Sequence, residues 1–177
     1  MNADRLASTF PTTIGLPAEL RAMCEWVATN GYPISGYFEL REHDDETLRC
    51  WFGSDSAVGE LAQFGAGADG SLYCLWRSPD DQQPIVHLGS EGDGLLVLAP
   101  TPVEFLRLLA IGYGELGFAD FDSPLSKEDE PDNINGDFQR WVTTTFDVTI
   151  PNIGAEIVSP AHKRHTDFQD WINARCG

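Results

Sequence analysis

The stretch from Phe64 to Gly112 constrains the fold most, because it has the pattern of a β-meander that runs directly into an amphipathic helix. Asp69-Gly70 within it is a strong reverse-turn signal, since both residue types tolerate positive φ. After this turn, Leu72, Cys74 and Trp76 occupy every second position, which is the pattern of a strand. Two short apolar runs follow, and each has the length of a strand. Three strands are therefore predicted, at residues 71–77, 85–88 and 95–99.

The signals for a helix follow the meander without a linker. Thr101 has the character of an N-cap, Pro102 suits the first helical position, and Glu104 stands three residues after the cap. Gly112 is a stop signal. One apolar face is predicted for this helix, made by Phe105, Leu106, Leu109 and Ala110. The block is a scaffold, and nothing in it has the pattern of a catalytic centre.

The rest of the chain supplies further helices and strands around this block. A helix is predicted from Pro17 to about Thr29, and two more are predicted at 138–146 and 166–174, the last capped by Thr166. Strands are predicted at 35–41, 47–52 and 59–64, and the first two are expected to pair across an acidic loop at 42–46. Residues 1–12 have the character of a loose arm, and 119–137 of a long acidic loop. The order predicts a single α+β domain over residues 1–177, with an antiparallel sheet covered by helices.

The chain is strongly acidic, with 28 Asp and Glu against 11 Lys and Arg and a formal net charge of −17. This balance disfavours nucleic acids and anionic membrane surfaces as partners, and it favours basic proteins. No apolar stretch approaches the length of a membrane span, and the N-terminal residues lack the apolar core of a secretory signal. We expect a cytoplasmic protein that is a monomer or a small homo-oligomer.

The cysteines give no sign of a metal site. Cys24, Cys50, Cys74 and Cys176 are widely spaced and form no C-x-x-C pair, so the spacing of zinc ligands is absent. Four free thiols fit a reducing cytosol, and the sequence leaves open a Cys50–Cys74 bridge between neighbouring strands.

The remaining candidates for chemistry are histidines and one serine. His162 and His165 form an H-x-x-H pair, but two cations separate them and no third ligand is near. His87 lies in a predicted strand and is expected to be a packed histidine. Ser90 lacks the spacing of a nucleophile elbow, because Gly89 precedes it directly. These patterns predict no metal, no cofactor and no enzymatic activity.

Several segments, taken in order, resemble the SUKH superfamily, whose members are similar to the fungal cell-wall assembly regulator and to bacterial toxin-immunity proteins. The segments are LPAELRAMCEWVATNG, SGYFEL, FGAGADGSLYCLW, VHLGSEGD and VLAPTPVEFLRLLAIGY, and the resemblance extends from about Ile14 to about Ile172. The order of FG-x-G-x-DGS-x-x-x-x-W, LGSEG and the FLRLLA helix carries it. The resemblance implies an α+β fold with an N-terminal helix, a curved antiparallel sheet of about six strands, and later helices packed on it.

The resemblance also implies a function. Members of the family are binding modules without common catalytic residues, and they commonly neutralise a cognate nuclease or deaminase toxin of a contact-dependent or secreted competition system. We therefore expect a non-enzymatic immunity protein, with a cytoplasmic regulatory or adaptor module of the same fold as the alternative. The segment FADFDSPLSKEDEPDNIN is not a shared family motif, so the resemblance does not identify the toxin.

The candidate partner-binding residues lie in and beside the acidic loop. Residues 119–137 hold one Lys against seven acids, and the functional interpretation is that these carboxylates mimic nucleic-acid phosphates in the basic cleft of a toxin. Tyr113 and Phe118 lead into this loop, either as exposed anchors or as residues packed beneath it. The predicted site comprises Tyr113, Phe118, Asp120, Asp122, Glu128, Asp129, Glu130 and Asp132. The alternative for the acids is a solvated surface loop.

Overall fold

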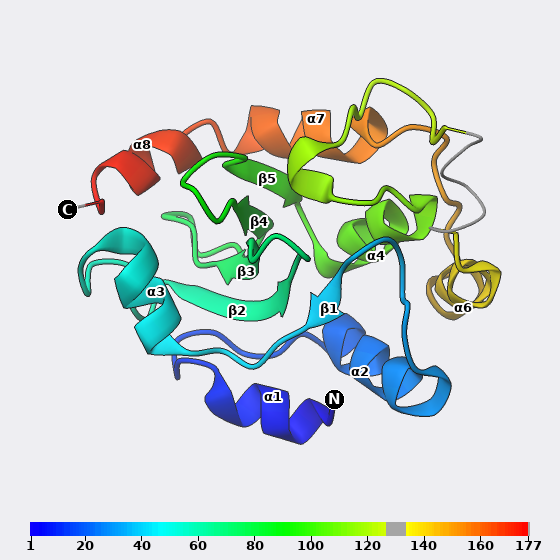
Figure 1. Cartoon of the computed structure of the whole chain (residues 1–177), viewed down its shortest axis with the longest axis horizontal. Coiled ribbons are helices and arrows are strands. Elements are labelled where there is room, and N and C mark those ends of the chain that lie inside the picture. The colour runs from blue at the N-terminus through cyan, green and yellow to red at the C-terminus, as the bar shows by residue number, and fades with distance from the viewer. Residues whose placement is uncertain (127–133, 177) are drawn as a thin grey trace.

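An antiparallel sheet of five strands, arranged in sequence order, forms the centre of the computed structural model, which describes residues 1–126 and 134–176 (Figure 1). The strands are β1 (Glu39–Leu40), β2 (Leu61–Ala66), β3 (Leu72–Trp76), β4 (Ile85–Leu88) and β5 (Leu96–Ala99). The helices are α1 (Ala3–Thr9), α2 (Ala18–Asn30), α3 (Asp45–Phe52), α4 (Pro102–Ile111), the 3-10 turn η1 (Leu116–Phe118), α6 (Gly136–Phe146), α7 (Ala155–Arg164) and α8 (Phe168–Asn173). The predicted α+β class is confirmed, with five strands where about six were expected.

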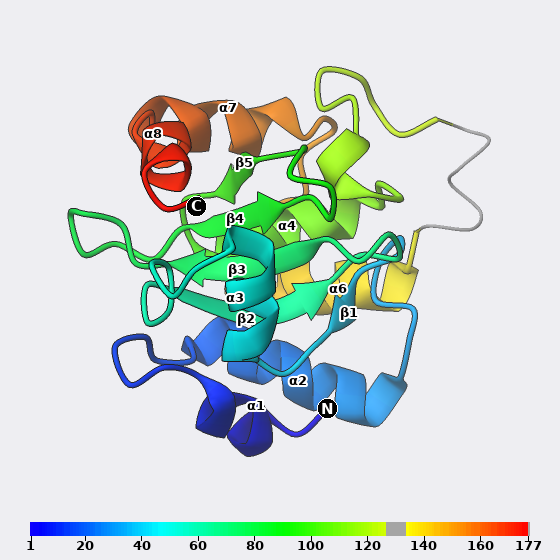
Figure 2. The ribbon, with the colours of Figure 1, turned by 60° about the vertical axis from the view of Figure 1, so that its left-hand side comes forward.

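Both faces of the sheet are buried. One face carries Phe64, Tyr73 and Leu98 into a larger core with α2, α4 and α6, and the other carries Cys74 and Trp76 into a second core with α3, α7 and α8. Figure 2 shows α3 in front of the sheet, α1 and α2 below it, and α7 and α8 above it. Burial on two sides explains why β3 is apolar at every position, since neither face of this strand meets water.

The meander and its helix form as predicted. The Asp69-Gly70 turn joins β2 to β3, and Gly70 has a φ of +86°, a conformation that glycine adopts without steric cost. At the start of α4 the hydroxyl of Thr101 accepts the amide N–H of Glu104 at 3.3 Å, and Pro102 occupies the first helical position. Phe105 on this helix is fully buried against the sheet.

The prediction of a strand at 47–52 is wrong, because these residues belong to α3. The carboxylate of Asp44 accepts the Glu46 N–H at 3.1 Å and the Thr47 hydroxyl at 2.9 Å, which caps a helix. Leu48 and Phe52 stand four residues apart, so they share one helical face, and both are buried in the second core. The acidic residues predicted as a loop at 42–46 therefore include the first turn of a helix, where carboxylates are favourable.

Two further helices differ from the sequence prediction. Residues 1–12 are not a loose arm, because Asn2 caps α1 and Leu6 on this helix is fully buried. The sequence prediction placed no element between Pro151 and residue 166, yet α7 lies there. Pro160 lies inside α7 and has no N–H to donate to the preceding turn. Local sequence signals therefore disfavour a helix at this position. The helix forms because its apolar residues pack against β5 and α4.

Smaller differences concern element lengths and the thiols. The strand predicted at 35–41 is limited to Glu39–Leu40, and the one predicted at 59–64 is β2, which begins at Leu61. The last helix starts at Phe168, after Asp167 and not after Thr166. The Cys50–Cys74 bridge left open by the sequence is absent, since both thiols are free and only Cys74 is buried.

Candidate binding surface

Three large aromatic side chains are exposed, and they border two adjoining clefts. Tyr32 is 45% exposed, Tyr37 57% and Phe118 63%, whereas nearly all other large apolar side chains in the described residues are buried or half-buried. Tyr37 lines both clefts, Tyr32 lines the first and Phe118 the second. We call these three side chains and the two clefts the aromatic surface. Exposed aromatic rings around a concave surface are typical of a binding site.

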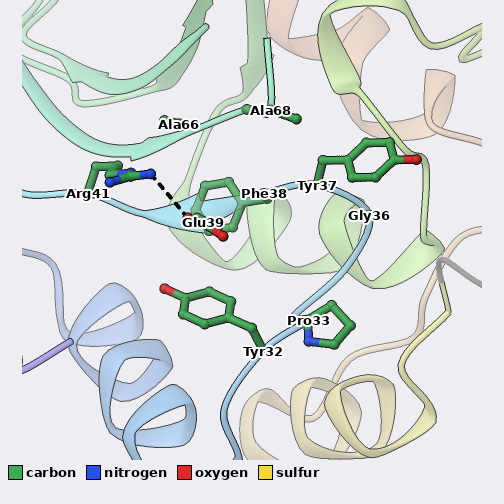
Figure 3. Close-up of a pocket in the computed structure, with 10 residues that line it drawn as sticks. Tyr32, Pro33, Gly36, Tyr37, Phe38, Glu39, Arg41, Ala66 and Ala68 are labelled. Atoms are coloured by element: carbon green, nitrogen blue, oxygen red, sulfur yellow. Dashed lines mark hydrogen bonds and ion pairs between the residues drawn. The ribbon is translucent and has the colours of Figure 1, made fainter. Parts of the chain in front are cut away.

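The first cleft lies where β1 pairs with the end of β2, and its volume is about 480 Å³ (Figure 3). Tyr32 and Tyr37 come from the segment that leads into β1, on opposite sides of Glu39, while Ala66 and Ala68 lie across the cleft. Glu39 forms an ion pair with Arg41 at 3.3 Å. The cleft is therefore lined by aromatic rings, a carboxylate and a cation that come from one short stretch of the chain.

Tyr32 has a structural task at this edge of the sheet. Leu40 donates its backbone N–H to the Tyr32 hydroxyl at 3.0 Å, so this amide of the edge strand bonds to a side chain and not to another strand. Burial raises the pKa of Tyr32 above its ordinary value, and the protonated hydroxyl can also donate its own hydrogen. The ring is held at the rim of the cleft by this bond.

The second cleft, of about 440 Å³, lies between Tyr37 and the segment that follows α4. Tyr113 is not exposed, since it retains only 8% of its accessible surface. Its hydroxyl donates to the carbonyl of Ser123 at 2.7 Å and accepts the N–H of Gly154 at 3.0 Å, and its ring meets Phe121 edge-on. Of the two aromatic residues predicted as anchors, Tyr113 packs beneath the segment and Phe118 points outward.

The backbone around Gly36 joins the two clefts. Tyr37 donates its N–H to the carbonyl of Gly114 at 3.0 Å, which ties the segment before β1 to the segment after α4. Gly36 has a φ of +48°, and a Cβ there would lie 2.2 Å from the Tyr113 carbonyl oxygen. Only glycine allows this close approach. Tyr37 is thereby placed between the clefts by contacts that are distant in sequence.

Carboxylates outnumber cations around the aromatic surface. Glu39 lines the first cleft, and Glu115 and Asp120 line the second, whereas Arg41 is the one basic side chain among the described residues that line either. Glu115 accepts the Ala68 N–H at 2.9 Å, and burial raises the pKa of this carboxyl. Three carboxylates and one cation of the described residues therefore line the two clefts.

The predicted acids of 119–137 are only partly described. Asp120 and Asp122 are exposed, and Asp120 also holds a turn by accepting the Ser123 hydroxyl at 2.7 Å. Asp137, in the first turn of α6, pairs with Arg140 at 2.7 Å. The other predicted partner-binding acids, Glu128, Asp129, Glu130 and Asp132, lie outside the described residues.

Sequence reasoning missed Tyr32 and Tyr37. The pattern predicts a strand around Tyr37, where alternation does not reveal which side chains are exposed, and no motif marks Tyr32. The available signal was their place beside glycine and proline in NGYP and SGYF, because such turn sequences lie at the surface.

The histidines predicted as candidates for chemistry and Ser90 differ in burial. His87 is buried and donates Nδ1–H to the Gly94 carbonyl at 2.7 Å, and burial lowers the pKa of this imidazole. His162 and His165 both line a small cleft with Leu95, but within residues 1–126 and 134–176 no three metal-ligating side chains come together. Ser90 is exposed on a turn.

Comparisons with protein-family models, with curated proteins and with solved structures found no match. In the described part of the chain, no helix has both the length and the apolar character needed to cross a bilayer.

Proposed function

We propose that this protein is a non-enzymatic immunity protein of SUKH type, which binds a basic toxin domain through the aromatic surface. The resemblance in the order of its sequence segments motivates the immunity role. The observation that carries the proposal is the grouping of Tyr32, Tyr37 and Phe118 around two clefts bordered by Glu39, Glu115 and Asp120. Aromatic anchors in a desolvated centre supply most of the affinity of protein complexes, and surrounding charges supply selectivity.

The charge of the chain supports a basic partner. Most arginines of the described residues are already paired with acids, namely Arg5, Arg21, Arg41, Arg49, Arg77, Arg107, Arg140 and Arg175. Because the net charge is −17, a large surplus of carboxylates remains after these pairs are made. A cationic partner relieves the repulsion among them, and it is steered to the surface before contact.

The test is binding to candidate toxin domains, beginning with those encoded beside this chain. Tyr37→Ala and Phe118→Ala should each weaken binding about tenfold or more, which corresponds to at least about 1.4 kcal/mol, while Tyr37→Phe retains the ring and should bind like the wild type. Each variant must keep the unfolding midpoint of the wild type. The wild type should protect cells that co-express the toxin domain, and Tyr37→Ala and Phe118→Ala should each lose this protection.

Salt dependence separates the aromatic and acidic contributions. Asp120→Asn with Asp122→Asn should slow association at low salt and leave dissociation nearly unchanged, and the difference should vanish at 1 M salt, where the Debye length is about 3 Å. Asp170→Asn, an exposed change on α8, is the control.

Two outcomes would contradict the proposal. Binding to a housekeeping protein in place of any toxin domain would favour the adaptor alternative, and unaltered binding by both aromatic variants would exclude the aromatic surface.

A further inference from the structure

The four cysteines fall into two classes. Cys24 and Cys74 are buried, and burial raises the pKa of the Cys24 thiol to about 11 and that of Cys74 still further from its ordinary value. Both are therefore protonated and shielded, which makes a thiol inert. Cys50 and Cys176 are exposed and free. Chemistry at sulfur is thus restricted to the exposed pair.

The two exposed thiols line the same cleft, although 50 and 176 are far apart in sequence. The cleft has a volume of about 470 Å³ and lies between α3, the turn at 90–92 and α8. Its walls include Trp51 beside Cys50 and Asn173 near Cys176. Figures 1 and 2 agree that the C-terminal segment after α8 comes back beside α3.

The segment that carries Cys176 is anchored in this position. Its N–H donates to the Ile172 carbonyl at 3.0 Å, which continues the turn of α8. The carbonyl of Arg175 accepts the hydroxyls of Ser54 at 3.1 Å and Ser56 at 2.6 Å, just after α3. These bonds fix the backbone next to Cys176 to the segment that follows Cys50.

The side chain of Arg175 strengthens this anchor. Its guanidinium donates to the Glu60 carboxylate at 2.7 Å and lies 4.3 Å from the centre of the Trp171 ring. Trp171 in turn donates its indole N–H to the same carboxylate at 2.9 Å. A shared carboxylate and a cation–π contact therefore hold the C-terminal segment against the end of the sheet that also carries α3.

We propose that Cys50 and Cys176 form a redox-active dithiol that a peroxide converts to a disulfide. One thiolate attacks the peroxide oxygen and becomes a sulfenic acid, and hydrogen peroxide is reduced with release of one water. The other thiol then attacks the sulfenic sulfur, an S–S bond forms, and a second water leaves. Two thiols are oxidised and one peroxide is reduced. The common cleft gives the second thiol a high effective concentration, which favours this closure over reaction between molecules. The disulfide ties α3 to the segment after α8.

The test uses the purified full chain and hydrogen peroxide. We expect the wild type to lose two titratable thiols together, to lose the mass of two hydrogen atoms and to remain the same size in solution. Peptide mapping without reductant should recover the Cys50 and Cys176 peptides joined. Cys24 and Cys74 should react with an alkylating reagent only after unfolding.

Single variants distinguish a pair from two independent thiols. In Cys50→Ser and Cys176→Ser the remaining exposed thiol should stop at the sulfenic acid, which dimedone traps, and no intramolecular disulfide should form. Dimedone should label the wild type less than either variant, because the second thiol removes the sulfenic acid. Equal labelling of all three proteins, stable sulfinic acids on the wild type, or disulfide-linked dimers as its main product would each overturn the proposal.

Discussion

At the β5 end of the sheet, α4 and α7 lie against the last strand, and Val97, Leu98 and Ala99 are buried. At the β1 end the strand has only two residues, a tyrosine hydroxyl takes the amide of Leu40, and Tyr37 is exposed. Both ends belong to one sheet with one pattern of pairing. The two ends share one core, since Phe38 and Leu40 at the β1 end are buried, as is Leu98 on β5, but only the β1 end also leaves aromatic surface available for recognition.

The largest effect should come from the covered part. Phe105 on α4 is fully buried and meets the rings of Phe38, Phe64 and Tyr73 at 5.4–6.0 Å. Phe105→Ala should lower the free energy of unfolding by about 3–5 kcal/mol, because it removes buried surface and leaves a cavity. Urea unfolding followed by tryptophan fluorescence measures this. A loss below about 1 kcal/mol would mean that this core repacks freely, and the contrast between the two ends would fail.

The next effect concerns the junction that joins the two clefts. Gly36→Ala should destabilise the protein by about 1–3 kcal/mol, because the new Cβ meets two backbone carbonyls and φ is positive. Gly15→Ala is the matched control, since a Cβ there meets nothing within 4 Å. If both variants unfold at the same denaturant concentration, the segment before β1 is not held by its contact with the segment after α4.

A smaller effect is expected at the open edge. Tyr32→Phe leaves the Leu40 N–H without its acceptor and should cost about 0.5–1.5 kcal/mol. Hydrogen exchange of the Leu40 amide should become faster, while Tyr37→Phe should leave it unchanged. An unchanged exchange rate in Tyr32→Phe would show that water replaces the hydroxyl without loss.

The smallest effect should be a change with pH in the covered part. Burial lowers the pKa of His87 below its ordinary value of 6.5, so the unfolded state binds more protons once the pH falls below that value. Stability should therefore decline as the pH drops from 6.5 toward the folded-state pKa. His162 and His165 contribute in the same direction, since burial lowers the pKa of both.

The comparison with His87→Asn isolates the His87 contribution. Asparagine can donate to the Gly94 carbonyl but does not titrate, so the unfolding free energy of this variant should depend less on pH between 5 and 7 than that of the wild type. Parallel curves for the two proteins would show that His87 binds protons equally in the folded and unfolded states.

Local signals predicted the centre of the fold and not its periphery. The meander and α4 follow from alternation, Asp69-Gly70 and the Thr101 cap, which act within a few residues. Residues 47–52 alternate like a strand, and only packing of Leu48 and Phe52 into the second core makes the helix the lower-energy choice. The packing of α7 likewise overrides Pro160.

The candidate site was less predictable because distant contacts decide which ring is exposed. Tyr113 and Phe118 have similar local sequences, and the sequence left exposure and burial open for both. The N–H of Gly154 and the carbonyl of Ser123 fix Tyr113 beneath the segment, and neither partner is signalled near residue 113. Tyr37 is placed by Gly114, which lies far along the chain.

The second core has a consequence for synthesis on the ribosome. Trp76 on β3 is covered by Phe168 and Trp171 of α8, which are translated long after the meander is complete. Chain elongation at about 5–20 residues per second leaves the part of this face that α8 covers exposed for several seconds after the meander is made. During that interval the growing polypeptide exposes hydrophobic aromatic surface that chaperones can bind and through which neighbouring nascent chains can aggregate.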